Sequence, residues 1–358
     1  MRLIIVGDPQ AARVGAHINA AAARLGLAVQ LCDVRDASRG PRWRQALSWR
    51  LHDRRPLRLD EFCGAVVESA REWKPDGLIA TGLAPLDEAA LRAIGALRVL
   101  RLNYLTDDPW NPAHRSRWFM QALPHYDHVF SPRRSNLQDL AAVLGSRVSY
   151  LPFAFAPDCH FPAAPMSQAE RQRFDSDVVF VGGADHDRIG IVRPFIDAGF
   201  SVALYGAYWT RYRATRRLAR GQIGPEEHRK AIGGGRVSLC LVRRANRDGH
   251  AMRTFEEPAM GGCMLVEDTG EHRDIFGVEG EAVRFFRTPA EAVQKVRELL
   301  ACDQERTRLA AAALARVRVP AHSYDSRLRT MLATAGLWDH GAHGLEGRIE
   351  AEAGAQRR

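Results

Sequence analysis

The chain has 358 residues, of which 46% are hydrophobic and 26% charged, and its formal net charge is +9. This length suits two domains, the composition argues against wholesale disorder, and no stretch approaches the ~20 apolar residues of a membrane-spanning helix. The basic balance comes almost entirely from arginine and favours anionic partners: nucleotide diphosphates, phospholipid surfaces or nucleic acid.

The N-terminal half alternates short apolar strands with helical patterns, which is typical of a parallel, doubly wound sheet. The predicted strands are Leu3–Val6, Ala28–Leu31, Gly77–Thr81, Arg98–Leu102, His128–Ser131 and Val148–Leu151. The predicted helices are Ala11–Leu25, Glu61–Trp73, Asp87–Ile94 and Ser135–Leu144. His17, on the first helix, is expected to be structural. The N-terminus is interpreted as a strand, not a signal peptide, and six cysteines without a CxxC pair predict reduced thiols in the cytoplasm.

Four prolines and the lack of a sustained period predict a domain linker at Pro152–Arg171. A second series of strands is predicted at Asp177–Gly182, Ser201–Tyr205, Val237–Val242, Cys263–Val266 and Ala282–Phe285. Its helices are predicted at Arg188–Ala198, Pro225–Ile232, Met252–Met260, Ala290–Leu300, Glu305–Val317 and His322–Ala335. We therefore expect domains over residues 1–160 and 172–320, a helix over 321–336 that packs back toward the first domain, and a frayed tail over 337–358.

The most informative stretch is residues 250–265, HAMRTFEEPAMGGCML, where a predicted helix ends at two glycines and runs directly into a strand. The free N–H groups at such a helix start suit a phosphate, and Arg253 can add a charge-assisted contact. Glu256 lies one turn further on, where its carboxylate can accept hydrogen bonds from vicinal hydroxyls, as on a ribose. The alternative is a surface ion pair between Arg253 and Glu257. His250 could contact a phosphate or cap the helix.

This motif resembles the donor motif of retaining GT-B glycosyltransferases. With the segments EDTGEHRDIFG, FVGGADHDR and LYGAYW, it resembles more closely the CgeB-type glycosyltransferase-like family, over roughly Asp175 to Leu332. Weaker similarity extends to LNYLTDDPWN and DHVFSPRRSNLQDL. The resemblance implies a GT-B fold of two Rossmann-like domains facing a central cleft, a UDP- or GDP-type sugar donor, no obligatory metal and no other cofactor. Glu256 matches the ribose-binding glutamate, and Asp248, a shorter carboxylate, stands at the position of an earlier glutamate and is a catalytic candidate.

Further donor-site candidates follow predicted strands of the C-terminal half, where open parallel sheets bind their ligands. These candidates are Gly182, Gly183, Arg188, Tyr205, Gly206 and Arg243. The glycine pair lets the backbone approach a ligand closely, although it does not complete a GxGxxG fingerprint. Asp185–Asp187 has the DxD form of a metal site, but its place at a predicted helix start favours capping. Tyr208 or Trp209 could stack on a base or be buried.

In the N-terminal half, Asp107 and Asp108 follow a predicted strand and are candidates for the catalytic carboxylate. A turn set by the Asp-Pro sequence is the alternative. Gly7–Gln10 follows the first strand and could meet the acceptor. The Trp-containing basic tract Arg39–Arg58 could lie on an anionic membrane or form a solvated helical face. A second arginine cluster, within residues 211–220, could bind the diphosphate, acceptor phosphates or nothing.

We therefore expect a metal-independent glycosyltransferase that moves a sugar from a nucleotide-diphosphate donor to a glycan, lipid-linked glycan, protein or metabolite. The expected location is cytoplasmic, with peripheral contact at the inner face of the membrane as a further option. One alternative is a basic nucleic-acid-binding protein, which is disfavoured because no recognised nucleic-acid module appears. The other is a catalytically inactive GT-B scaffold that binds a partner protein.

Overall fold

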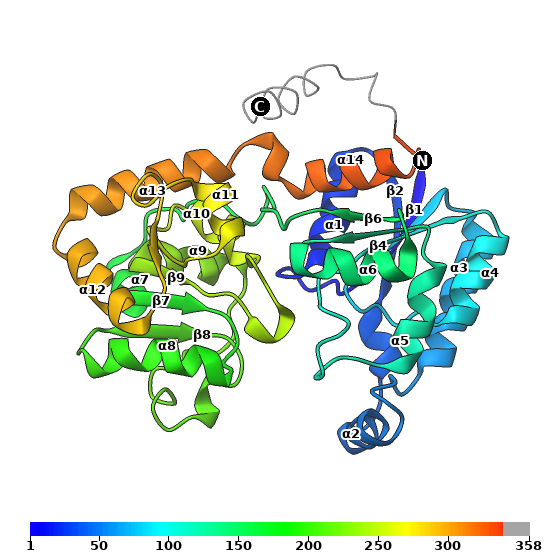
Figure 1. Cartoon of the computed structure of the whole chain (residues 1–358), viewed down its shortest axis with the longest axis horizontal. Helices are drawn as coiled ribbons and strands as arrows, with labels where there is room; N and C mark the ends of the chain where they lie inside the picture. The colour runs from blue at the N-terminus through cyan, green and yellow to red at the C-terminus, as the bar shows by residue number, and fades with distance from the viewer. Residues whose placement is uncertain (339–358) are drawn as a thin grey trace.

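Two α/β domains, each built on a parallel sheet, make up the computed structural model, which describes residues 1–338 (Figure 1). The strands of the N-terminal domain are β1 (Arg2–Gly7), β2 (Ala28–Asp33), β3 (Gly77–Thr81), β4 (Leu100–Tyr104), β5 (His128–Ser131) and β6 (Val148–Tyr150). Those of the C-terminal domain are β7 (Ser176–Val181), β8 (Val202–Tyr205), β9 (Gly235–Cys240), β10 (Met264–Glu267) and β11 (Arg284–Phe286). All neighbouring strands run parallel. The predicted pair of doubly wound sheets is confirmed.

Helices cover both faces of each sheet, as the continuous apolar strands require. The N-terminal helices are α1 (Val14–Arg24), α2 (Arg42–Leu51), α3 (Leu59–Trp73), α4 (Glu88–Ala96), α5 (Arg117–Ala122) and α6 (Leu137–Leu144). The C-terminal helices are α7 (Gln168–Phe174), α8 (His186–Asp197), α9 (Pro225–Gly234), α10 (Arg253–Ala259), α11 (Gly270–Phe276), α12 (Pro289–Leu300), α13 (Asp303–Val317) and α14 (Tyr324–Thr334). In β1, Leu3 and Ile5 join one core cluster with α1, while Ile4 and Val6 join another with α3 and α4.

The strand order creates one switch point in each domain. The two sheets have the orders β2-β1-β3-β4-β5-β6 and β11-β10-β9-β7-β8, so the chain reverses direction between β1 and β3 and again between β7 and β9. Loops after the strands diverge at such points and leave a crevice, where doubly wound folds bind ligands. The two domains therefore each offer a crevice, and the loops that follow β1, β3, β7 and β9 define where a site can form.

The C-terminal helix crosses back to the first domain. Figure 1 shows α13 and α14 running along one edge of the molecule, from the C-terminal domain onto the N-terminal domain. Helix α14 packs on α1, and the Arg24 Nε–H donates to Asp325 at 3.0 Å. Arg327 donates to the carbonyl oxygens of Pro152 (2.8 Å) and Phe153 (3.1 Å). The two bonds from Arg327 attach the start of the linker to α14.

Two expectations about irregular segments are corrected. The predicted linker already contains the start of α7, because Ser167 and Glu170 form a capping box that initiates a helix. Leu337 and Trp338 pack against the core, although they fall in the tail that was expected to fray. The remainder of that tail, residues 339–358, lies outside the described residues.

Candidate functional site

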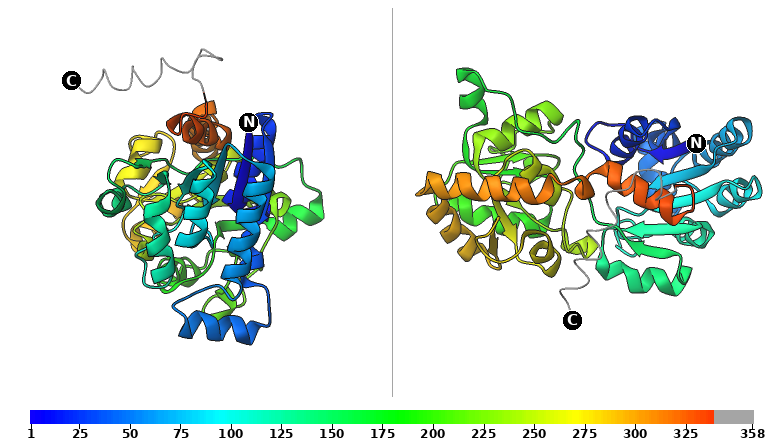
Figure 2. Two further views of the ribbon diagram at one scale, coloured as in Figure 1. Left: turned by 90° about the vertical axis from the view of Figure 1, so that its right-hand side faces the viewer. Right: turned by 90° about the horizontal axis from the view of Figure 1, so that it is seen from above.

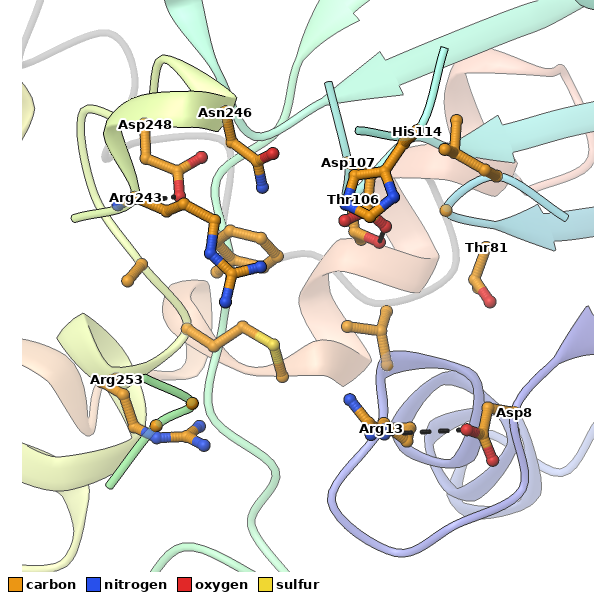
Figure 3. A pocket seen from close by; sticks show the side chains of 18 of the residues that line it. Asp8, Arg13, Thr81, Thr106, Asp107, His114, Arg243, Asn246, Asp248 and Arg253 are labelled. Carbon is orange, nitrogen blue, oxygen red and sulfur yellow. Dashed lines mark hydrogen bonds and ion pairs between the residues drawn. The ribbon is translucent and has the colours of Figure 1, made fainter. Parts of the chain in front are cut away.

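A cavity of about 580 Å³ opens between the two domains, at both switch points. Its N-terminal wall comes from the loops after β1, β3 and β4 and includes Asp8, Arg13, Gly15, Thr81, Gly82, Thr106, Asp107 and His114. Its C-terminal wall comes from the loops after β7 and β9 and the start of α10, and includes Gly182, Gly183, Arg188, Arg243, Asn246, Asp248 and Arg253. Figure 3 shows these walls facing each other. The volume lies within the range of small-molecule sites.

The turn after β7 is shaped by close backbone packing. A Cβ on Gly206 would lie 2.3 Å from the Gly182 carbonyl oxygen, so that position must stay glycine. The Trp209 Nε1–H donates to the same carbonyl at 2.8 Å. Asp185 accepts from the Arg188 N–H at 2.9 Å and caps α8, which confirms the predicted cap. The predicted donor contact at Gly206 is corrected, because this glycine supports the turn from outside the cavity.

Three arginines make the C-terminal wall cationic. Arg188 is buried, donates to the Gly183 carbonyl oxygen at 2.9 Å and stacks on Phe180. Burial lowers the pKa of Arg188, but a guanidinium remains charged at neutral pH. Arg253 donates through Nε to the carbonyl oxygen of Val181 at 2.8 Å, and its side chain is 25% exposed. Arg243 is more open, and together the three guanidinium groups suit a phosphate-bearing ligand.

Glu256 does not line the cavity. Its side chain is only 1% exposed and is paired with Nη1 of Arg253. The predicted ribose contact is therefore corrected: the helical i, i+3 spacing holds Glu256 behind Arg253, where its charge fixes the guanidinium. The alternative of a solvent-exposed ion pair is wrong as well, because Glu257 is also buried, accepts from the Ser238 hydroxyl at 2.7 Å and has a pKa that burial raises to about 8.

Three more predicted residues also lie outside the cavity lining. His250 is fully buried: its Nδ1–H donates to Glu271 at 2.6 Å and its Nε2 accepts from the Phe153 N–H at 3.1 Å. With both ring nitrogens occupied, it cannot contact a phosphate. Tyr205 is 2% exposed and packs in the core. The buried Asp108 was predicted to be catalytic, but both of its carboxylate oxygens accept hydrogen bonds from Arg247 of the other domain.

The loop between β9 and α10 is bound by side chains of the N-terminal domain. Asn111 of the N-terminal domain donates to Asn246 at 2.7 Å. Arg133, which follows β5, pairs with Asp248. The Ser135 hydroxyl donates to the carbonyl oxygen of Arg247 at 2.7 Å. These bonds hold the two domains together around the cavity and position its C-terminal wall.

The two cavity carboxylates of the predicted catalytic set differ in their surroundings. Asp248 is nearly buried, pairs with Arg133 and accepts from the Arg243 N–H at 3.3 Å. Burial raises the pKa of Asp248. Asp107 is half-buried, and its carboxylate accepts a hydrogen bond from the Thr106 hydroxyl at 3.5 Å. Asp107 therefore keeps a carboxylate open to the cavity, whereas Asp248 orders the interface.

The sequence did not point to several residues that line the cavity. Arg133 lies two residues after β5, so the rule that ligands meet the loops after strands could have found it. Its Nη1 is buried and has no hydrogen-bond partner among residues 1–338. His114 and Asn246 lie in loops without a local pattern, and only the tertiary fold brings them to the cavity.

Behind Arg253, a buried polar cluster joins the two domains and the linker. His17 of α1, His160 of the linker and Glu256 of α10 have side-chain atoms within 4.8 Å of one another. The Ala156 N–H donates to His160 Nδ1 at 2.8 Å, so the neutral ring carries its proton on Nε2, which lies 3.8 Å from Glu256. Such a nitrogen has no lone pair for a metal, and metal-bound histidines donate from their other nitrogen instead. The group is therefore a polar junction between the domains.

This junction predicts acid sensitivity of the fold. Burial lowers the pKa of His17 to about 4 and that of His160 to about 3. Below pH 6.5 the unfolded chain binds these protons while the native state does not, so the free energy of unfolding falls as the pH falls from about 6.5 to 4.

We expect His17→Gln to reduce that pH slope by about 1.4 kcal/mol per pH unit, the value for one proton. Urea unfolding across this pH range measures the slope. His52→Gln, at an exposed position, serves as the control and should keep the wild-type slope. An unchanged slope in His17→Gln would show that His17 is not held neutral.

Comparisons with known proteins agree with this geometry. Residues 188–333 match the family model of glycosyl transferase-like proteins. Sucrose-phosphate synthase from Thermosynechococcus elongatus has a similar fold, with a TM-score of 0.63, 12% identity, and 94% of this chain and 98% of that chain covered. Anabaena HepE in complex with UDP and glucose gives a TM-score of 0.60, 13% identity, and coverage of 94% and 99%. UDP-GlcNAc 2-epimerase from Neisseria meningitidis, bound to UDP-GlcNAc, gives a TM-score of 0.52 and 12% identity, with 94% of this chain and 99% of that chain covered. No curated protein matches the sequence significantly.

The fold is therefore GT-B, two Rossmann-like domains that face a central cleft. In its C-terminal domain the chain is similar to the glycosyl transferase-like family, and the matched residues include all three arginines of the cationic wall. At 12–13% identity the solved structures show the fold alone.

Proposed function

We propose that the protein is a CgeB-type glycosyltransferase that transfers a sugar from a UDP- or GDP-linked donor to an acceptor. The observation that carries the proposal is the cavity at the facing switch points, which sets Arg188, Arg243 and Arg253 on one wall and Asp107 on the other. A cationic wall in a glycosyltransferase-like domain suits the diphosphate of a sugar donor. The UDP and glucose named for HepE, which shares the fold, support the same class of ligand.

The proposed reaction breaks the bond between the sugar and the diphosphate and forms one between the sugar and the acceptor oxygen. Negative charge then develops on the leaving diphosphate, and the three guanidinium groups stabilise it where a divalent metal would otherwise do so. The acceptor hydroxyl loses its proton to Asp107, which acts as general base from the opposite wall. Asp8, at the switch point of the N-terminal domain, lies on the acceptor side of the cavity.

We include a cytoplasmic location in the proposal. All six cysteines are free thiols in the structure, which suits a reducing compartment. Within residues 1–338, no helix combines the length and apolar character needed to cross a membrane.

Donor turnover is the test of the proposed activity. The protein is incubated with UDP- and GDP-sugars and candidate glycan acceptors, and the products are followed by NMR. We expect a free nucleoside diphosphate and a new glycoside in equal amounts. A sugar nucleotide that is epimerised but intact would contradict the transfer reaction, and failure of every donor to bind would contradict the site.

Arg243 offers a matched pair of variants. We expect Arg243→Gln to weaken UDP binding by roughly 10- to 100-fold, the worth of one charge-assisted hydrogen bond. Arg244 is next in sequence, 61% exposed and paired with Glu267, and it does not line the cavity. Calorimetric titration should therefore give Arg244→Gln the wild-type affinity. Equal losses in both variants would indicate a general charge effect instead of a contact in the cavity.

A further inference from the structure

Helix α2 carries an apolar stripe that the fold leaves uncovered. Trp43, Leu47 and Leu51 are 66%, 50% and 68% exposed. They follow one another at intervals of four residues, so they share one face of the helix. Figures 1 and 2 show α2 projecting from the N-terminal domain, at the end opposite to α14. A surface of this kind on a ten-residue helix marks an interaction site.

Cationic side chains surround this stripe. Arg42, Arg44 and Arg50 form no ion pair among the described residues. Arg44 lies over the Trp43 ring, 5.5 Å from its centroid. The segment from Arg39 to His52 contains no acidic residue. The exposed face therefore combines bulky apolar groups with unneutralised positive charge, the pattern of a helix that lies in a membrane interface.

The domain holds α2 firmly at its C-terminal end. The Ser48 hydroxyl donates to the carbonyl oxygen of Arg55 at 2.9 Å. Arg54 donates to the carbonyl oxygens of Pro112, Ala113 and Arg115 at 2.6, 3.1 and 2.8 Å. This fork ties the helix to the loop after β4, which also supplies His114 to the cavity.

A second side of α2 reaches the cavity. Trp49 is two residues beyond Leu47, about 200° around a helix of 3.6 residues per turn, and it lines the cavity. The same helix thus presents one side outward and the other to the mouth of the proposed site. Whatever α2 binds therefore lies beside the cavity.

We propose that α2 docks the protein on an anionic membrane surface, with Trp43, Leu47 and Leu51 inserted among the lipids and the three arginines over the headgroups. An anionic lipid surface complements both features of α2, because the acyl chains bury the apolar stripe and the headgroups neutralise the arginines. A second copy of the chain would bring like-charged arginines together. A nucleic acid would leave the Trp-Leu stripe exposed. This docking is independent of the proposed reaction.

Sedimentation with vesicles tests the docking. The full chain is mixed with vesicles of phosphatidylcholine alone, or of phosphatidylcholine with phosphatidylglycerol. We expect binding to the anionic vesicles only, weakened by high salt. Arg42→Gln/Arg44→Gln/Arg50→Gln should weaken binding by roughly 100-fold, since each arginine near an anionic surface adds about fivefold.

A matched control distinguishes the effect of where the arginines lie from the effect of the total charge removed. Arg211, Arg213 and Arg216 are exposed on the C-terminal domain, and replacing all three by Gln removes the same net charge. That variant should keep vesicle binding, whereas Trp43→Ser/Leu47→Ser/Leu51→Ser should lose it. Far-UV circular dichroism shows that each variant is folded. Failure of the wild type to bind UDP would refute the proposed reaction without affecting the docking.

Equal losses in the two arginine triples would overturn the proposal, as would wild-type binding to neutral vesicles alone. Binding to a short RNA duplex with no binding to anionic vesicles would overturn it in favour of a nucleic-acid partner.

Discussion

Asp107→Asn is expected to slow sugar transfer by roughly 100- to 10 000-fold, the usual contribution of a general base. Asp107 lines the cavity opposite the three arginines, and its carboxylate is open to that space. Because its role is to take the acceptor proton, the variant should keep its affinity for UDP. Steady-state kinetics with a saturating donor, combined with UDP titration, measures both quantities.

The adjacent Asp108 provides the control. It is buried and paired with Arg247, outside the cavity lining. Asp108→Asn should lower stability while keeping the rate within about tenfold of the wild type, because it removes an interdomain pair and no reacting group. If Asp108→Asn lost the rate and Asp107→Asn kept it, the assignment of the base would be wrong.

Glu256→Ala is expected to lower the free energy of unfolding by about 3–5 kcal/mol, the cost of breaking a buried ion pair. Arg253 would then have only Glu257 as a nearby carboxylate, at 3.8 Å. Affinity for UDP should fall as well, since Arg253 loses the charge that fixes it in the cavity wall. Urea unfolding and calorimetric titration measure the two effects.

Glu257→Gln is the matched control, because glutamine mimics a protonated carboxyl group. It should change stability little near pH 4, below the pKa of Glu257 in both the native and the unfolded chain. The contribution of Glu257 to wild-type stability should fall as the pH rises from about 4.5 toward 8, opposite in sign to that of the two histidines, because the unfolded chain ionises first. Glu257→Gln should remove that loss and should therefore be more stable than the wild type at neutral pH. If Glu256→Ala instead kept full stability and lost only donor binding, Glu256 would contact the ligand directly, as the sequence suggests.

The fold could be predicted because buried parallel strands are short apolar runs. The stretch Leu3–Val6 identified β1, and Gly77–Thr81 identified β3 without error. Helix α11 was missed because seven residues with a capping threonine carry too little periodicity. The start of helix α7 falls within the predicted linker, because its capping box is a short local signal at the end of a proline-rich stretch.

The site could be predicted in part. Open parallel sheets bind ligands at the loops that follow their strands, and Gly182, Gly183, Arg188 and Arg243, chosen on that basis, all line the cavity. The direction of a side chain on a short helix is a tertiary property, and so the sequence could place Glu256 beside Arg253 but not behind it. Contacts between domains are equally invisible in a single sequence, which is why Asp108 appeared catalytic.

A crystal structure with UDP tests the central claim most directly. We predict that the diphosphate lies against the Gly182–Gly183 turn and contacts Arg188, Arg243 or Arg253. A nucleotide bound in the N-terminal domain, or anywhere outside the cavity between the domains, would contradict this account.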